Sequence, residues 1–174
     1  MKSRLAALAL LSGLLAGCNM PPPVAIAPMP TSVAQFKPWL GTGPASLRGS
    51  ALLTTLGGGV KTCAGEPVLL IPASPYFQNI HDSNEAVDRQ AVIGNSAYID
   101  QFGHSTTCGP QGHFEFDNVP AGKWFVVTAV MWAAPDDGEL EQQGGPMEKE
   151  VDLAPGKTRV TLAGENQVDW MFAN

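Results

Sequence analysis

The fold class follows from one stretch, Gly112-His113-Phe114-Glu115-Phe116-Asp117-Asn118-Val119-Pro120-Ala121-Gly122-Lys123-Trp124-Phe125-Val126-Val127-Thr128. Phe114 and Phe116 alternate with polar neighbours, which is typical of a half-buried strand. The residues from Trp124 to Trp132 are apolar on both faces, as expected for a strand in the middle of a fold. Between them, Asp117 to Gly122 supply turn residues with fixed or permissive φ angles. The stretch therefore predicts two strands joined by a short connection.

Further short strands are expected on both sides of this unit. Gly57-Gly58-Gly59 and Ala154-Pro155-Gly156 mark turns between some of them, and no amphipathic helix of useful length interrupts the pattern. About seven short strands with Gly and Pro turns predict an all-β chain, an antiparallel β-sandwich. The expected additional strands are Leu47–Thr54, Val60–Thr62, Val68–Ile71, Lys149–Leu153, Thr158–Leu162 and Gln167–Phe172.

Two stretches break the strand pattern. Residues 76–107 are polar and irregular, and Asp82-Ser83-Asn84-Glu85 within them resembles the start of a short helix over residues 86–91. Residues 133–146 contain Asp136-Asp137-Gly138 and Gly144-Gly145, which predict a long loop or an extended hairpin. Long insertions are where binding surfaces usually lie, so both stretches are candidates for binding.

The stretch from Gly112 to Thr128 resembles the hallmark of carboxypeptidase regulatory-like domains: Gly-x-Phe-x-Phe, then Val-Pro-x-Gly, an aromatic residue and a β-branched strand. The run from Thr62 to Pro72 is similar to an earlier strand of such domains. This resemblance covers residues 46–162 and implies a seven-stranded antiparallel transthyretin-like (prealbumin-like) β-sandwich. It implies core and turn roles, and no active site, for Phe114, Phe116, Val119, Pro120, Gly122 and Trp124.

The N-terminal residues predict a lipid anchor. Lys2 and Arg4 precede an apolar stretch, Leu5 to Leu15, that is too short to span a bilayer. The run Leu15-Ala16-Gly17-Cys18 that closes it resembles the bacterial lipobox. This resemblance implies a lipoprotein in which residues 1–17 are a removed signal peptide and Cys18 carries the lipid. An ordinary signal peptide with a cysteine near its cleavage site is the alternative.

Asn19 follows the cysteine, where lipoproteins retained in the inner membrane of enteric bacteria commonly have aspartate. The resemblance therefore favours the outer membrane, with the protein facing the periplasm. Residues 19–44 hold seven of the fifteen prolines, a density that favours polyproline II. We expect residues 18–44 to be a lipidated tether and residues 45–174 to be one domain. Phe36, Trp39 and Leu40 are expected to pack onto that domain, with a partner-binding motif as the alternative.

The charge of the chain excludes some partners. Without Lys2 and Arg4, the ten basic side chains fall to eight against sixteen acidic ones, so the mature chain has a net charge of −8. Such a chain is a poor candidate for binding nucleic acid or an anionic lipid surface, because little in it would neutralise phosphates. Once Cys18 carries lipid, Cys63 and Cys108 remain as a pair in an oxidising compartment, which predicts a disulfide. Two reduced cysteines or a metal pair are the alternatives.

We therefore expect a non-catalytic binding or structural module of the cell envelope, without a cofactor, whose partner is an envelope protein or the cell wall. The alternative is a metal-dependent enzyme similar to the intradiol ring-cleaving dioxygenases, which bind iron through two tyrosines and two histidines. The chain has both residue types but lacks the His-x-His pair of that family, since Phe114 and Glu115 follow His113. No metal ligand is therefore assigned.

The candidate binding surface combines polar and aromatic residues of the two insertions with the end of the long apolar strand. Asp136 and Asp137, with Glu139, form an acidic cluster that is either a Ca²⁺ site or a solvated hairpin tip. Trp132 contributes either to a sugar or peptide surface or to the cover of the core. The complete set is Tyr76, His81, Tyr98, His104, Trp132, Asp136 and Asp137.

Overall fold

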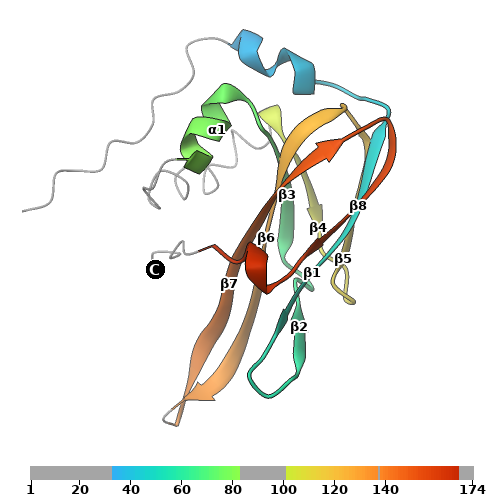
Figure 1. Ribbon diagram of the computed structural model, residues 1–174. Coiled ribbons are helices and arrows are strands. Elements are labelled where there is room, and N and C mark those ends of the chain that lie inside the picture. Colours follow the sequence, from blue (N-terminus) through green and yellow to red (C-terminus); the bar gives the residue numbers. More distant parts are fainter. Residues whose placement is uncertain (1–32, 83–100, 137, 169–174) are drawn as a thin grey trace, which may run out of the picture.

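The computed structural model describes residues 33–82, 101–136 and 138–168 of the chain. Two four-stranded sheets pack against each other, and helical segments cover the outer face of one of them (Figure 1). The prediction of an all-β protein with a sandwich-like core is confirmed. The first sheet contains β1 (Ala45–Thr54), β2 (Val60–Thr62), β5 (His113–Val119) and β8 (Gly156–Leu162). The second has the order β4 (His104–Thr107), β3 (Pro67–Pro72), β6 (Gly122–Asp136) and β7 (Glu139–Leu153).

Strand β6 forms the centre of the fold and is buried on both faces. Trp124 and Val126 point into the core between the two sheets, whereas Phe125 and Val127 belong to a second apolar cluster on the outer face. Side chains alternate between the two faces of a strand, so a strand between two cores must be apolar at nearly every position. The prediction of an apolar central strand is confirmed.

The hairpin of β6 and β7 is the longest feature of the fold. Each strand has 15 residues, and the pairing runs from Gly122 with Leu153 to Asp136 with Glu139. Its outer half extends past the end of the sandwich, next to the hairpin of β1 and β2 (Figure 1). Residues 133–146 therefore form an extended hairpin, the second of the two structures that the sequence predicts for this stretch.

The outer face of the second sheet is covered by the 3₁₀ helix η1 (Val33–Trp39) and by α1 (Pro75–Asp82) (Figure 1). Phe36 of η1 is fully buried, and its ring stacks on Phe102 at a centroid distance of 4.0 Å. Trp39 packs against the inter-sheet core and donates a hydrogen bond from Nε1 to the carbonyl oxygen of Lys123 at 2.8 Å. Phe36 and Trp39 thus pack onto the domain as predicted, while Leu40 remains 44% exposed.

The connection between β5 and β6 places the aromatic residue of the motif. Asn118 has a φ of 57°, and the pairing of β1 with β5 shifts register between Ala45 and Leu47 at this point. Trp124 donates a hydrogen bond from its indole Nε1 to the carbonyl oxygen of Pro120 at 3.0 Å. The short connection therefore orients the buried indole as well as reversing the chain.

The predicted disulfide between Cys63 and Cys108 is present, with the two Cα atoms 5.7 Å apart. Both cysteines are buried in the inter-sheet core. Cys63 follows β2, and Cys108 follows β4, so the bond connects the two sheets near one end of the sandwich.

The prediction of seven antiparallel strands is wrong in two respects. The described residues form eight strands, and β8 runs parallel to β1 from the pair Ala45 and Gly156 to the pair Ala51 and Leu162. The turn after Leu153 carries the chain from the second sheet to the first, so β8 pairs with β1 and not with its neighbour in sequence. Turn signals in the sequence mark where a strand ends, but they do not say which sheet the next strand joins.

The short helix predicted over residues 86–91 lies outside the described residues, so it stays a prediction. The structure has a helix just before that stretch, α1, which covers Pro75–Asp82. Ser74 caps it, since the backbone N–H of Phe77 donates to Ser74 Oγ at 3.4 Å. Pro75 suits the first helical turn because proline lacks the N–H that a helix start leaves unpaired. Ser74-Pro75 was the start signal that the sequence analysis missed.

The last strand predicted from the sequence, Gln167–Phe172, is described only at its beginning. The 3₁₀ helix η2 (Gly164–Asn166) precedes it, and Gln167 forms an isolated antiparallel bridge with Met147. Residues 169–174 lie outside the described part of the chain.

Candidate functional site

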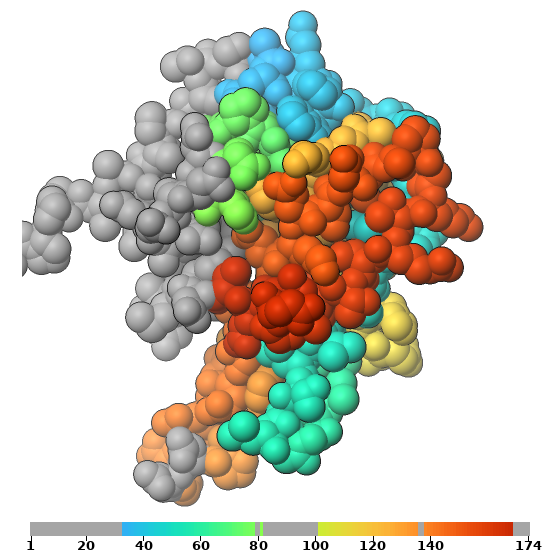
Figure 2. Space-filling model, viewed as in Figure 1, coloured from blue at the N-terminus to red at the C-terminus, as the bar shows by residue number. Residues whose placement is uncertain are grey.

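A groove of about 470 Å³ opens where the β6–β7 hairpin passes the end of β1. In Figure 2 the η2 segment lies where this hairpin, in orange, meets the green β1–β2 hairpin. The volume is in the range of small-molecule sites, about 300–1,000 Å³. We call it the Trp132 groove; it is lined by residues 52–54, Trp132, Gln143, Gly144, Ala163, Gly164 and Gln167.

Trp132 occupies a fixed position in this groove. Its side chain is half-buried and packs against the inter-sheet core. Gly144 on β7 makes room for the ring, because a Cβ atom there would lie 2.7 Å from Trp132 Cζ3, and the φ of +92° at this residue also favours glycine. Part of a large aromatic ring is therefore covered by packing while the remainder faces the groove.

Two glutamine side chains add hydrogen-bonding groups beside the ring. Gln143 is half-buried and is the cross-strand partner of Trp132. Gln167 is exposed, and its backbone forms a bridge with Met147. The N–H of the next residue, Val168, donates a hydrogen bond to the carbonyl oxygen of Pro146 at 3.1 Å. The groove thus combines an aromatic surface with amides on fixed backbone.

None of the described residues that line the Trp132 groove carries a charge. Acidic residues lie nearer the hairpin tip. Glu141 and Glu139 precede Gln143 on the same face of β7, and both are exposed. Lys61, an exposed residue of β2, is the cross-strand partner of the groove residue Leu53. The groove itself is therefore neutral, and its surroundings toward the hairpin tip are acidic.

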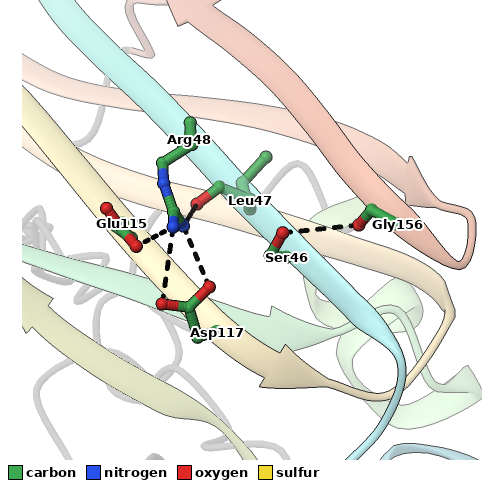
Figure 3. A network of polar contacts seen from close by, with 6 residues as sticks. All are labelled: Ser46, Leu47, Arg48, Glu115, Asp117 and Gly156. Carbon is green, nitrogen blue, oxygen red and sulfur yellow. Dashed lines mark hydrogen bonds and ion pairs between the residues drawn. The ribbon is translucent and has the colours of Figure 1, made fainter.

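A second groove, of about 390 Å³, lies between β4 and β5 and is charged. Arg48 in its wall forms ion pairs with Glu115 and with Asp117, the latter at 3.1 Å (Figure 3). Phe114, also in the wall, is 4% exposed. The Arg48 guanidinium is already bound by carboxylates, and the Phe114 ring is buried. This second groove therefore has fewer groups available to contact a ligand than the Trp132 groove.

The predicted site residues Tyr76 and His81 both lie on α1. His81 Nε2 is 2.7 Å from Glu148 Oε1, and the imidazole stacks on Phe125 at a centroid distance of 4.6 Å. The Tyr76 ring lies edge-on to Phe36, with centroids 6.4 Å apart. The His81 contacts attach α1 to the outer face of the sheet, and the Tyr76 contact connects α1 to η1.

His104 lies on β4 beside Trp124, with ring centroids 5.4 Å apart. Burial lowers the pKa of His104 below its ordinary value, because the charged imidazolium is less well solvated there. Asp136 ends β6 opposite Glu139, while Tyr98 and Asp137 lie outside the described residues.

The residues predicted for one surface are therefore distributed over the fold. Helix α1 lies toward one end of the sandwich, and the tip of the β6–β7 hairpin lies at the other (Figure 1). Of the residues predicted for the binding surface that the structure describes, Trp132 lines the groove named after it, and the others do not.

Gln143 and Gln167 are groove residues that were not predicted from the sequence. A two-residue turn centred on Asp137-Gly138 sets a hairpin register in which residue 132 faces residue 143, so the first was within reach of sequence analysis. Gln167 is brought to the groove by the path of the chain through η2, which has no such local signal.

In the described ranges, no three His, Cys, Asp or Glu side chains gather closely enough to hold a metal ion. No helix among those residues has both the length and the apolar character needed to cross a bilayer.

Comparison with known proteins shows similarity at the level of the fold. No family model matches the sequence, and a search among curated proteins finds no match. A search of solved structures finds a proposed carbohydrate-binding protein from Pseudomonas aeruginosa, with a TM-score of 0.61 and 21% sequence identity. The match covers 74% of this chain and 94% of the other. The two proteins therefore share a fold.

Proposed function

We propose that this chain is a non-catalytic binding module of the bacterial cell envelope and that its Trp132 groove binds a carbohydrate. The observation that carries the proposal is the half-buried Trp132, held against Gly144 in an open groove of about 470 Å³. The C–H faces of a sugar ring stack on an indole, because the face of the aromatic ring is negative and attracts weakly positive hydrogens. A fixed, partly open tryptophan offers that surface.

The polar groups of the groove suit the hydroxyl groups of a sugar. The side-chain amides of Gln143 and Gln167 and the hydroxyl of Thr54 both donate and accept hydrogen bonds. The described lining contains no acidic or basic side chain that would transfer a proton to or from a substrate. Stacking and hydrogen bonding without such a group favour binding over chemical conversion.

Two similarities support this proposal. The Pseudomonas aeruginosa protein that shares the fold is itself proposed to bind carbohydrate. The run from Gly112 to Thr128 is similar to the motif of carboxypeptidase regulatory-like domains, and on that basis we assign the sandwich to the transthyretin-like class. In that assignment β2 is an additional short strand, and β8 lies parallel to β1.

The groove would face away from the membrane if Cys18 carries the lipid. Val33, where the described chain begins, belongs to η1 at the end of the molecule opposite the β6–β7 hairpin tip (Figure 1). A proline-rich tether on the outer membrane, running from Cys18 to the start of η1 at Val33, would thus present the Trp132 groove to glycans of the periplasm and cell wall.

The test is oligosaccharide binding by the mature chain in detergent, first on a glycan array and then by calorimetry with the best neutral oligosaccharide. We expect Trp132→Ala to weaken binding at least about tenfold, a loss of roughly 1.4 kcal/mol. Trp132→Phe should retain part of the affinity because an aromatic face remains. Circular dichroism and thermal unfolding check that each variant folds.

Gln142→Ala is the matched control. Gln142 is next to Gln143 but points to the opposite face of β7, where its amide lies 3.7 Å from Met131 Sδ. Its replacement should leave affinity unchanged. Carbohydrate binding would be rejected if the wild-type chain bound no oligosaccharide, or if a folded Trp132→Ala variant bound as well as wild type.

A further inference from the structure

We infer that the ligand of the Trp132 groove is an uncharged saccharide, and that Gln143 and Gln167 select it by hydrogen bonding to its hydroxyl groups. This inference rests on the carbohydrate binding proposed above. It adds the charge of the ligand and two residues that determine specificity.

Gln143 is placed to bind a sugar that stacks on Trp132. The two residues are directly opposite each other on adjacent strands, and side chains of such pairs share one face with Cβ atoms about 4.5–5.5 Å apart. Gln143 is half-buried and lines the groove together with Trp132. A hydroxyl at the edge of a stacked sugar ring is within reach of this amide.

Gln167 approaches the groove from η2. A Cβ atom built on Gly145 would lie 3.0 Å from Gln167 Nε2, which places the amide directly over the backbone of β7. Asn166 stiffens the preceding turn, because its Oδ1 accepts a hydrogen bond from the N–H of Ala163 at 3.1 Å. Two amides on separate fixed segments can therefore bind hydroxyls on one ligand, and preorganised groups lose less entropy on binding.

The charges around the groove exclude anionic sugars. Glu141 and Glu139 lie on the face of β7 that carries Gln143, and Glu165 of η2 is adjacent to the groove residue Gly164; all three are exposed. Lys61 is the cation on the neighbouring strand. Glu141, Glu139 and Glu165 outnumber Lys61, so the electrostatic potential on the hairpin side of the groove is negative. Glu141 is two residues from Gln143, about 7 Å along the strand, which is within the screening length of about 8 Å at physiological salt, so a uronic acid or a phosphorylated sugar is repelled.

The first experiment tests the two amides with a neutral trisaccharide that binds the wild-type chain, drawn from maltotriose, cellotriose and triacetylchitotriose. We expect Gln143→Ala and Gln167→Ala each to weaken its binding about 3- to 10-fold, as for the loss of one hydrogen bond. Gln142→Ala, on the opposite face of the same strand, should have no effect.

Gly145→Ala provides an independent test of Gln167. The backbone of Gly145 does not adopt a positive φ, and the added Cβ would press on the end of a flexible side chain. The variant should therefore fold, but it should displace the Gln167 amide and weaken binding as Gln167→Ala does. In a Gln167→Ala background, Gly145→Ala should cause no further loss.

The second experiment tests charge. Trigalacturonic acid, and galactotriose as its neutral counterpart, differ in the carboxylates alone. We expect the acid to bind at least about tenfold more weakly than its counterpart and than the best neutral trisaccharide at 0.15 M salt. Glu141→Gln together with Glu139→Gln should narrow that difference several-fold while leaving neutral binding unchanged, because the repulsion between exposed charges is removed.

The outcomes separate the two proposals. If trisaccharides bind through Trp132 but the glutamine variants bind like wild type, or uronic acids bind as tightly as neutral sugars, the inference is wrong while carbohydrate binding stands. If no saccharide binds, both are wrong.

Discussion

Single glycines determine where two aromatic side chains lie in this protein. A Cβ atom on Gly49 of β1 would collide with the Phe114 ring. A Cβ atom on Gly144 of β7 would collide with the carbonyl oxygen of Val130 and with the Trp132 ring. The sequence predicts Gly144 as part of a loop or hairpin. The structure shows it inside a strand, where an aromatic residue on the neighbouring strand compensates for the missing side chain.

The disulfide is the residue pair with the largest expected effect on stability. Replacing Cys63 and Cys108 by alanine should lower the free energy of unfolding by about 2–5 kcal/mol, because the unfolded chain is no longer cross-linked over 45 positions. Urea unfolding followed by tryptophan fluorescence measures the change. An equal urea midpoint for the wild-type and double-alanine proteins would contradict the prediction.

Among the secondary-structure elements, η1 and α1 depend on the sheet beneath them. An isolated helix of seven or eight residues is marginal in water, so burial must supply its stability. Phe36 provides this for η1, and Phe77 with the His81–Glu148 contact provides it for α1. The expectation that Phe36 and Trp39 pack onto the domain came from their apolar character; the helical form of η1 was not expected from so proline-rich a stretch.

Phe36→Ala tests the docking of η1. We expect a loss of about 3–5 kcal/mol in unfolding free energy, since a fully buried ring stacked on Phe102 is removed. Leu40→Ala, one residue beyond η1 and 44% exposed, is the matched control and should change stability by less than about 1 kcal/mol. Chemical denaturation compares the two variants; a similar loss in both would mean that Phe36 does not hold η1 in place.

In the complete fold, η1 and the tip of the β6–β7 hairpin lie at opposite ends (Figure 1). The Trp132 groove lies beside the outer half of that hairpin, away from η1. This arrangement suits the binding module proposed above, because the groove remains free when the η1 end is tethered to a membrane.

Cys18→Ser tests the anchor. Two or three acyl chains, at roughly 0.8 kcal/mol per buried methylene, hold a protein on a bilayer almost permanently, so their loss should release it. We expect palmitate labelling to disappear and the variant to leave the membrane fraction. Retention of Cys18→Ser in washed membranes, with unchanged processing, would refute the lipid anchor. The Cys63→Ala/Cys108→Ala protein is the control, and it should still be labelled.

Most of the strands were predictable from the sequence, and the site was not. The alternation of Phe114 and Phe116, and the apolar run from Trp124, specify a half-buried and a doubly buried strand through local periodicity. Of the groove residues, Trp132 was predicted because it is a large aromatic residue at the end of that run. Gln167 was not, because it reaches the groove through contacts between residues distant in sequence.

Local physical chemistry therefore predicted the β class of this protein, the short connection before β6 and the acidic character of the chain, because each depends on residue type or on spacing within a few positions. The pairing of Cys63 with Cys108 was predicted from the cysteine count, and the structure confirms it. Three features depended on the assembled fold: the parallel pairing of β8 with β1, the docking of α1 on the outer face of the second sheet, and the Trp132 groove. They arise from packing between segments that are distant in sequence. The free energy of that packing depends on both segments together, so neither segment alone predicts it.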